Sequence, residues 1–186
     1  MPDSPTGGYF IRMLSCPKWP DGENSSFESV EKLPADLITN DLKTTRDQLS
    51  WWYAENNDKD SLIRIATALT SSFKLKPDEP IMMISVPAGT LAGLLTLKQS
   101  SKDAKTALID AKRQHYDSMN MICADLEELA EEIAKATSGD NSHFEIHELN
   151  LDDITQYMKE QYAHKNVAIN RNLGLWAREV LGIESD

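Results

Sequence analysis

The sequence predicts an α+β protein in which a small mixed sheet is covered by amphipathic helices. Three observations predict this class: strand-like runs at Leu49–Ala54 and residues 81–86, a helix-spaced apolar stripe between them, and an amphipathic helical pair near the C-terminal end. The chain has 186 residues, 40% of them apolar, which suits one core. We expect a single domain over residues 1–186, within which residues 150–186 could form a helical appendage.

The best-defined part is a strand–helix–strand unit. Leu49–Ala54 alternates between two faces, so the neighbouring Trp51 and Trp52 are both buried only if both sheet faces are covered. We favour that arrangement over one tryptophan at a partner-binding surface. A helix-spaced stripe follows at residues 62, 65, 66 and 69, and residues 81–86 are apolar on both faces, as is typical of a central parallel strand. The unit predicts one right-handed βαβ crossover.

The other elements are predicted from local patterns. Strands are expected at Tyr9–Leu14 and over residues 143–148. A short helix is expected over residues 90–97, and another starts at Ser100, where Asp103 completes a capping box. A strongly amphipathic helix follows and ends near residue 136. A C-terminal pair of helices is expected over residues 150–162 and 168–181. Gly182 fits a left-handed helix end.

The charge of the chain limits its function. Thirty acidic and 19 basic residues give a net charge of −11, which opposes general binding to nucleic-acid phosphates and favours a basic protein partner. No apolar run approaches the roughly 18 residues that span a membrane, and the N-terminal residues lack a signal-peptide pattern. Cys16 and Cys123 are expected as reduced thiols in a cytoplasmic protein, and no cofactor motif is found.

An acidic run gives the leading candidate site. Its carboxylates straddle the apolar stripe of the amphipathic segment and form a negative ridge: Asp125, Glu127, Glu128, Glu131 and Glu132. Such a run is usually a solvated helix face. The more specific hypothesis is a docking surface for a basic partner, or a mimic of nucleic-acid phosphates.

A second candidate is a metal site at His143, Glu145 and His147. On a strand these side chains point the same way, and two imidazoles with a carboxylate suit zinc or iron. The alternation with Phe144 and Ile146 is equally explained by an edge strand with one solvated face. We favour the solvated edge strand.

A third candidate is a ligand site at the turn after residues 81–86. Ser85, Gly89 and Thr90 would lie at the carboxyl end of a central strand, where ligands bind in open α/β sheets. The turn has one glycine and no lysine, so it does not match nucleotide-binding loops. The alternative is an ordinary strand-to-helix connection.

The C-terminal helical pair and the cysteines give weaker candidates. Basic residues scattered over the pair suggest a helix-turn-helix, but most helix pairs are packing units: Lys159, His164, Lys165, Arg171 and Arg178. Neither Cys16 nor Cys123 lies in a nucleophile motif.

These patterns lead to one main functional hypothesis and two alternatives. The main hypothesis is an acidic protein-binding module that docks onto a basic macromolecule, as a bacterial antitoxin, immunity protein or anti-defence factor does. The alternatives are a small enzyme or ligand-binding protein that uses the His143/Glu145/His147 face or the Gly89 turn, and a DNA-binding regulator that uses the C-terminal helices. The sequence predicts no set of catalytic residues, and it does not predict the oligomeric state.

Overall fold

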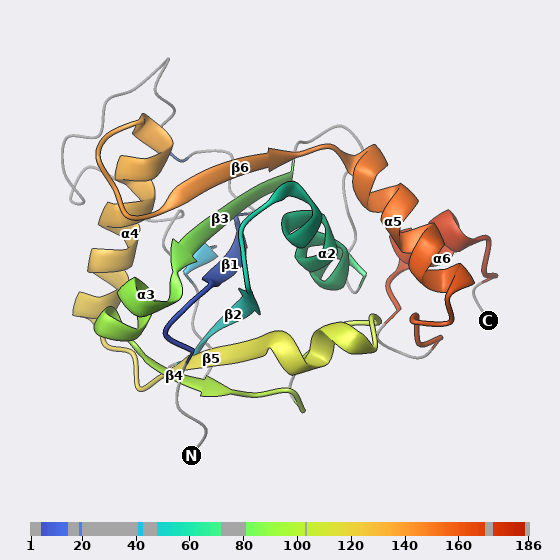
Figure 1. Cartoon of the computed structure of the whole chain (residues 1–186), viewed down its shortest axis with the longest axis horizontal. Helices are drawn as coiled ribbons and strands as arrows, with labels where there is room; N and C mark the ends of the chain where they lie inside the picture. Colours follow the sequence, from blue (N-terminus) through green and yellow to red (C-terminus); the bar gives the residue numbers. More distant parts are fainter. Residues whose placement is uncertain are drawn as a thin grey trace.

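A six-stranded sheet organises the chain, with strand order β4-β5-β2-β1-β3-β6 (Figure 1). The computed structural model describes residues 5–14, 19, 41–42, 48–71, 81–102, 104–169 and 173–184. Its strands are β1 (Tyr9–Leu14), β2 (Leu49–Ala54), β3 (Ile81–Pro87), β4 (Thr96–Gln99), β5 (His115–Met119) and β6 (Glu145–Leu149). The predicted strands are therefore found in the sheet, together with two that the sequence did not indicate.

The strand–helix–strand unit is confirmed, but its strands are not hydrogen-bonded to each other. Helix α2 (Lys59–Thr70) connects β2 to β3, and β1 lies between these two strands, antiparallel to both. All pairings between the named strands are antiparallel, so the prediction of a partly parallel sheet was wrong. Strands β2 and β3 do not pair in parallel because β1 occupies the position between them. Phe10 and Ile11 of β1 are completely buried on its opposite faces, which suits the centre of a sheet covered on both sides.

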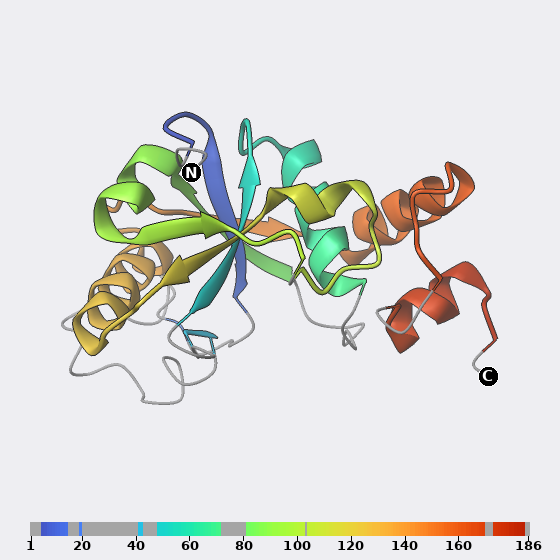
Figure 2. The ribbon, with the colours of Figure 1, turned by 90° about the horizontal axis from the view of Figure 1, so that it is seen from below.

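Helices cover both faces of the sheet. Figure 2 shows α3 (Ala88–Leu94) and α4 (Cys123–Ser138) on one side, and α2, α5 (Leu151–Ala163) and α6 (Leu175–Leu181) on the other. Trp51 packs in the core under α3 and α4, and Trp52 packs in the core under α2, α5 and α6. Both side chains are at most 2% exposed. The prediction of two-sided burial is confirmed.

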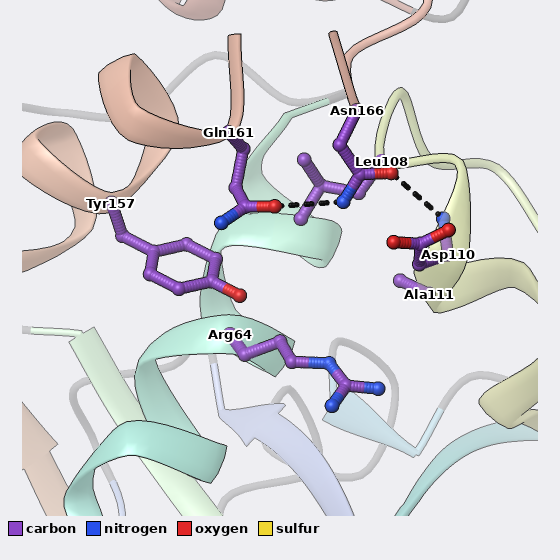
Figure 3. Close-up of a pocket in the computed structure, with 7 residues that line it drawn as sticks. All are labelled: Arg64, Leu108, Asp110, Ala111, Tyr157, Gln161 and Asn166. Carbon is purple, nitrogen blue, oxygen red and sulfur yellow. Dashed lines mark hydrogen bonds between the residues drawn. The ribbon is translucent and has the colours of Figure 1, made fainter. Parts of the chain in front are cut away.

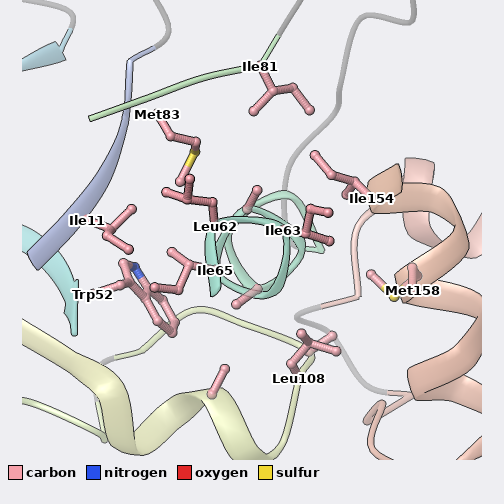
Figure 4. Packing of buried hydrophobic residues seen from close by; sticks show 14 of the residues in the cluster. Ile11, Trp52, Leu62, Ile63, Ile65, Ile81, Met83, Leu108, Ile154 and Met158 are labelled. Carbon is pink, nitrogen blue, oxygen red and sulfur yellow. The ribbon is translucent and has the colours of Figure 1, made fainter. Parts of the chain in front are cut away.

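The core on the α2 side also holds the C-terminal helices. Figure 4 shows α2 between sheet residues such as Ile11 and Trp52 and the α5 residues Ile154 and Met158. Because Ile154 and Met158 are completely buried there, the region considered as an appendage shares the core of the sheet. No helix in the described ranges has the length and apolarity needed to span a membrane.

Capping residues define several helix ends, and Gly182 is one of them, as predicted. Asp58 accepts a hydrogen bond from the Ser61 amide at the start of α2, and Asn150 accepts one from the Asp152 amide at the start of α5. Helices α4 and α6 end at Gly139 and Gly182, which have φ angles of 76° and 64°. In this left-handed region glycine carries no steric penalty.

The segment between β3 and α4 differs most from the prediction. Helix α3 begins at Ala88 and ends at Leu94, before the predicted end, and the chain continues into β4. Instead of a helix from Ser100, the structure has a short 3₁₀ helix η2 (Asp110–Gln114) followed by β5. Asp103 lies outside the described residues. Three alanines of the predicted helix are buried in the core, where they pack from η2 and the segment before it: Ala104, Ala107 and Ala111.

The second C-terminal helix starts later than predicted. Helix α6 begins at Leu175, and Val167 forms an isolated antiparallel bridge with Leu108. The Ala168 amide donates to the Ala107 carbonyl, and Ile169 is 56% exposed rather than part of the buried stripe. Pairing with the segment before η2 satisfies these backbone groups, so a helix is not needed there.

Candidate functional site

Four polar side chains meet where β3 and β6 pass the start of α2. Ser85 Oγ lies 2.8 Å from Nε2 of His147. Asn57, which precedes α2, donates from Nδ2 to Ser85 Oγ at 3.3 Å and to Glu145 Oε2 at 2.7 Å. The register places Ser85 opposite Glu145. The structure therefore joins one residue of the predicted ligand site, Ser85, to two of the predicted metal ligands, Glu145 and His147.

Partial burial determines the protonation of His147. Burial lowers the pKa of His147 below the ordinary value of 6.5, and Glu145, whose Oε2 lies 3.9 Å from Nε2, acts in the opposite direction. The imidazole is therefore neutral at pH 7. Nε2 of His147 and the Ser85 hydroxyl share one hydrogen bond, and its donor depends on which ring nitrogen carries the proton.

The cluster does not have the geometry of a nucleophilic triad. In a triad the carboxylate orients the imidazole from the ring nitrogen opposite the nucleophile. Here Ser85 and Glu145 both face Nε2 of His147, and Ser85 has no solvent exposure. The hydrogen bonds instead fasten edge strand β6 and the start of α2 to β3.

The predicted three-ligand metal set is not assembled. His143 precedes β6, and its backbone amide is directed to Glu132 of α4, so it does not share the strand alternation with Glu145 and His147. Within the ranges that the structure describes, no group of three or more His, Cys, Asp or Glu side chains is arranged to hold a metal ion. Phe144 is buried and Glu145 exposed at the edge of the sheet, as the edge-strand alternative predicts.

The residues of the predicted ligand turn are also separated. Gly89 and Thr90 lie within α3, which packs on the face of the sheet that holds Phe10 and Trp51. Ser85 points to the opposite face, toward Asn57 and His147. The reason is strand alternation, because residue 85 and the helix that follows β3 occupy different sides of the sheet.

The predicted acidic ridge lies on α4, but its carboxylates are not equivalent. Asp125 accepts a hydrogen bond from the Ile122 amide at 2.8 Å and so caps its own helix. Lys135 Nζ lies 2.7 Å from Glu131 and 3.0 Å from Glu132. Burial acts to raise the pKa of Glu132, but hydrogen bonds from Lys135, Ser142 and the His143 amide outweigh it and lower that pKa. Three of the five carboxylates therefore have internal roles.

The remaining two carboxylates face solvent. Glu127 and Glu128 are exposed, and neither forms a hydrogen bond or ion pair in the part of the chain that is described. They lie within two turns of Ile122, which is 63% exposed, and of the exposed Cys123. We call Ile122, Cys123, Glu127 and Glu128 the α4 surface. Cys123 is thus a free cysteine on the surface, and Cys16 lies outside the described residues.

The C-terminal helices do not form a compact helix-turn-helix. Residues 164–174 separate α5 from α6, far more than the 3–4-residue turn of that motif. Lys159, His164 and Lys165 are exposed, whereas Arg178 donates from Nε to the Leu173 carbonyl. Arg171 lies outside the described residues.

A second polar cluster was missed because β5 was not recognised in the sequence. His115 and Asp117 are 5% and 6% exposed, and the imidazole Nε2 lies 3.9 Å from Asp117 Oδ1. Ser100 Oγ lies 2.8 Å from His115 Nδ1, and Ser50 donates to Asp117 Oδ1 at 3.0 Å. The His115 ring also meets Trp52 edge-on at 5.1 Å. These contacts join the β4–β5 hairpin to β2, and the alternation of His115 and Asp117 is the only sequence signal for them.

An open pocket of about 220 Å³ was also not indicated by the sequence. It lies between α2, η2, α5 and the segment after α5 (Figure 3). Its lining residues are mostly polar: Arg64, Leu108, Asp110, Ala111, Tyr157, Gln161 and Asn166. Each is unremarkable in the sequence, and only the packing of α5 against α2 brings Arg64 and Tyr157 to the same space.

The fold and these sites define an α+β protein with a six-stranded antiparallel sheet between two helical layers. Comparisons with protein-family models, with curated proteins and with solved structures found no match.

Proposed function

We propose that this protein binds a basic protein partner through the α4 surface. The observation that carries the proposal is the pair Glu127 and Glu128, two exposed carboxylates without an internal partner in the described residues, on the helix whose N-cap residue, Ile122, is 63% exposed. An exposed apolar side chain and exposed carboxylates on one helix can supply the anchor and the charged rim of a docking site.

The net charge supports the same proposal. At −11, the chain attracts a basic partner over distances of about a Debye length and speeds their encounter. The neutralised residues Glu131 and Glu132 add little to this attraction, so the proposed binding residues are fewer than the five of the predicted ridge. A bacterial antitoxin, immunity protein or anti-defence factor of the cytoplasm is a protein of this kind, and the proposal includes that class.

The product of the neighbouring gene provides a direct test. We would titrate the purified neighbour into the unlabelled protein by calorimetry at about 50 mM and about 500 mM salt. Glu127→Gln/Glu128→Gln should weaken binding about fivefold at low salt and flatten its salt dependence, because exposed charges contribute about 0.2–1 kcal/mol each. Ile122→Ala, measured in the same way, should weaken binding about tenfold through loss of the anchor.

A charge-matched variant separates the site from net charge. Glu148 and Glu179 are exposed on β6 and α6, and Glu148→Gln/Glu179→Gln removes the same two charges elsewhere. This control should bind like the unchanged protein at high salt and nearly so at low salt. Equal weakening by both double variants, or binding to a basic neighbour that is insensitive to Ile122 and to salt, would contradict the proposal.

A further inference from the structure

The pocket beside α5 contains hydrogen-bond donors that no described residue uses. Arg64 of α2 forms no ion pair within the described residues, and the Tyr157 hydroxyl of α5 forms no hydrogen bond there. Figure 3 shows the Tyr157 hydroxyl directed into the space above the Arg64 side chain. A guanidinium and a hydroxyl on adjacent helices are typical ligands for anionic oxygens.

A pair of amides fixes a third donor. Asn166 Nδ2 donates to Gln161 Oε1 at 2.7 Å, and the Asp110 amide donates to Asn166 Oδ1 at 3.2 Å. This network determines which end of the Gln161 amide is its oxygen, so its Nε2 group remains as a donor on the Tyr157 side of the pocket (Figure 3). The donor is oriented by residues outside α5, which keeps it in place without a ligand.

The protonation of Tyr157 matches this role. Burial is the largest effect and raises the pKa of Tyr157; Arg64 opposes it, and the carboxylates of Asp110, Glu160 and Asp60 reinforce it. The phenol therefore keeps its proton at neutral pH and remains a donor.

The opposite rim of the pocket carries the opposite charge. Asp110 is exposed at the start of η2, and its carboxylate points toward the pocket in Figure 3. It would repel a dianion such as phosphate, but it would attract an ammonium group. The buried Leu108 and Ala111 add apolar surface between the two charged sides.

We propose that this pocket binds a free amino acid, with the carboxylate held by Arg64, Tyr157 and Gln161 and the ammonium group facing Asp110. The pocket volume of about 220 Å³ is below the roughly 300–1,000 Å³ of pockets for drug-sized ligands, which restricts the ligand to a small molecule. The site is separate from the α4 surface, which lies on the other side of the sheet (Figure 2).

Calorimetric titration of the full chain with each standard amino acid tests the proposal. At least one should bind with a Kd below roughly 1 mM. For that amino acid, the carboxamide and the N-acetyl derivative should each bind about tenfold more weakly, since each removes one charge. Arg64→Met should abolish the preference for the free carboxylate, and Asp110→Asn should abolish the preference for the free amine.

Two further variants complete the test. Tyr157→Phe removes one oxygen and should weaken binding about threefold, and it serves as the test if Arg64→Met does not fold. Arg113→Met removes an exposed positive charge of η2 that does not line the pocket and should leave the affinity unchanged. The proposal is overturned if no amino acid binds at about 10 mM, if Arg64→Met and Tyr157→Phe both bind as the unchanged protein does, or if acetate or phosphate binds as tightly as the amino acid.

Discussion

The hydroxyl of Ser85 is hydrogen-bonded to Nε2 of His147 at 2.8 Å, and this bond joins a completely buried residue of β3 to the edge strand β6. Asn57 extends the connection to the start of α2. The sheet edge and the helix that covers it are therefore held by one polar network as well as by apolar packing.

The first prediction concerns the serine of this network. Ser85→Ala leaves Asn57 and His147 without a buried partner, and we expect a loss of about 1–3 kcal/mol in the free energy of unfolding. Glu145→Gln is the control, because the Glu145 side chain is 57% exposed and the amide oxygen still accepts from Asn57. It should cost less than about 0.5 kcal/mol in urea unfolding. Equal effects of the two substitutions would mean that the buried hydroxyl has no special role.

The second prediction concerns the pH dependence of His147. Its folded-state pKa is lowered by burial, with Glu145 opposing, so the unfolded chain binds the proton more readily than the folded one. Stability from this group is fully present above the unfolded value of 6.5 and declines as the pH falls from there toward the folded pKa. Urea unfolding between about pH 5 and pH 8 should show the stability difference between the unchanged protein and His147→Gln shrinking at the acidic end. A difference that is constant over this range would exclude His147 as the titrating group.

Much of the fold could be predicted from local patterns. The limits of β1 and β2 match the predicted ranges, and Asp58, Asn150 and Gly182 mark helix ends through interactions within a few residues. Such signals depend on short-range contacts and are visible in one sequence. The burial of Trp51 and Trp52 on opposite faces follows from strand alternation in the same way.

The features that were missed depend on contacts between distant residues. Strand β1 is inserted between β2 and β3, and local sequence patterns do not predict the order of strands in a sheet. Strand β5 was missed because its buried positions His115, Asp117 and Ser118 are polar and are satisfied by Ser50, Ser100 and Leu49 across the sheet. The pocket combines Arg64 with Tyr157 from helices far apart in the chain. The metal and turn candidates were drawn from local spacing alone. In the structure His143 lies before β6, and α3 packs on the face of the sheet opposite Ser85.

The third prediction concerns Gly8, which directly precedes the central strand β1. Its φ is 78°, and a Cβ atom there would lie 2.5 Å from the Ala54 carbonyl oxygen. Gly8→Ala should therefore cost at least about 2 kcal/mol, since the left-handed conformation alone costs about 1–2 kcal/mol. Gly7→Ala is the matched control, because a Cβ atom at Gly7 meets no atom within 4 Å. Thermal unfolding of both variants checks this, and a Gly8→Ala protein as stable as Gly7→Ala would show that β1 starts differently.

The fourth prediction concerns Glu132, which joins the end of α4 to the turn before β6. Its carboxylate accepts from Lys135 and Ser142 at 3.0 Å each, and from the His143 amide at 3.4 Å. Glu132→Ala should cost about 1–2 kcal/mol, whereas Glu131→Ala, which loses only a half-exposed ion pair with Lys135, should cost less than about 0.5 kcal/mol.

The pH dependence of unfolding shows whether Glu132 stabilises the protein through its charge or through its shape. Burial acts to raise its pKa, but the hydrogen bonds from Lys135, Ser142 and His143 lower it below 4.5 overall, so the folded protein holds the carboxylate in its charged form. Its stabilising effect is present above the unfolded value and is lost as the pH falls through the folded pKa. The stability advantage of the unchanged protein over Glu132→Gln should therefore shrink as the pH falls below the unfolded value of 4.5 in urea titrations. If the advantage persists at the acidic end, the turn before β6 is held by the shape of the residue and not by its charge.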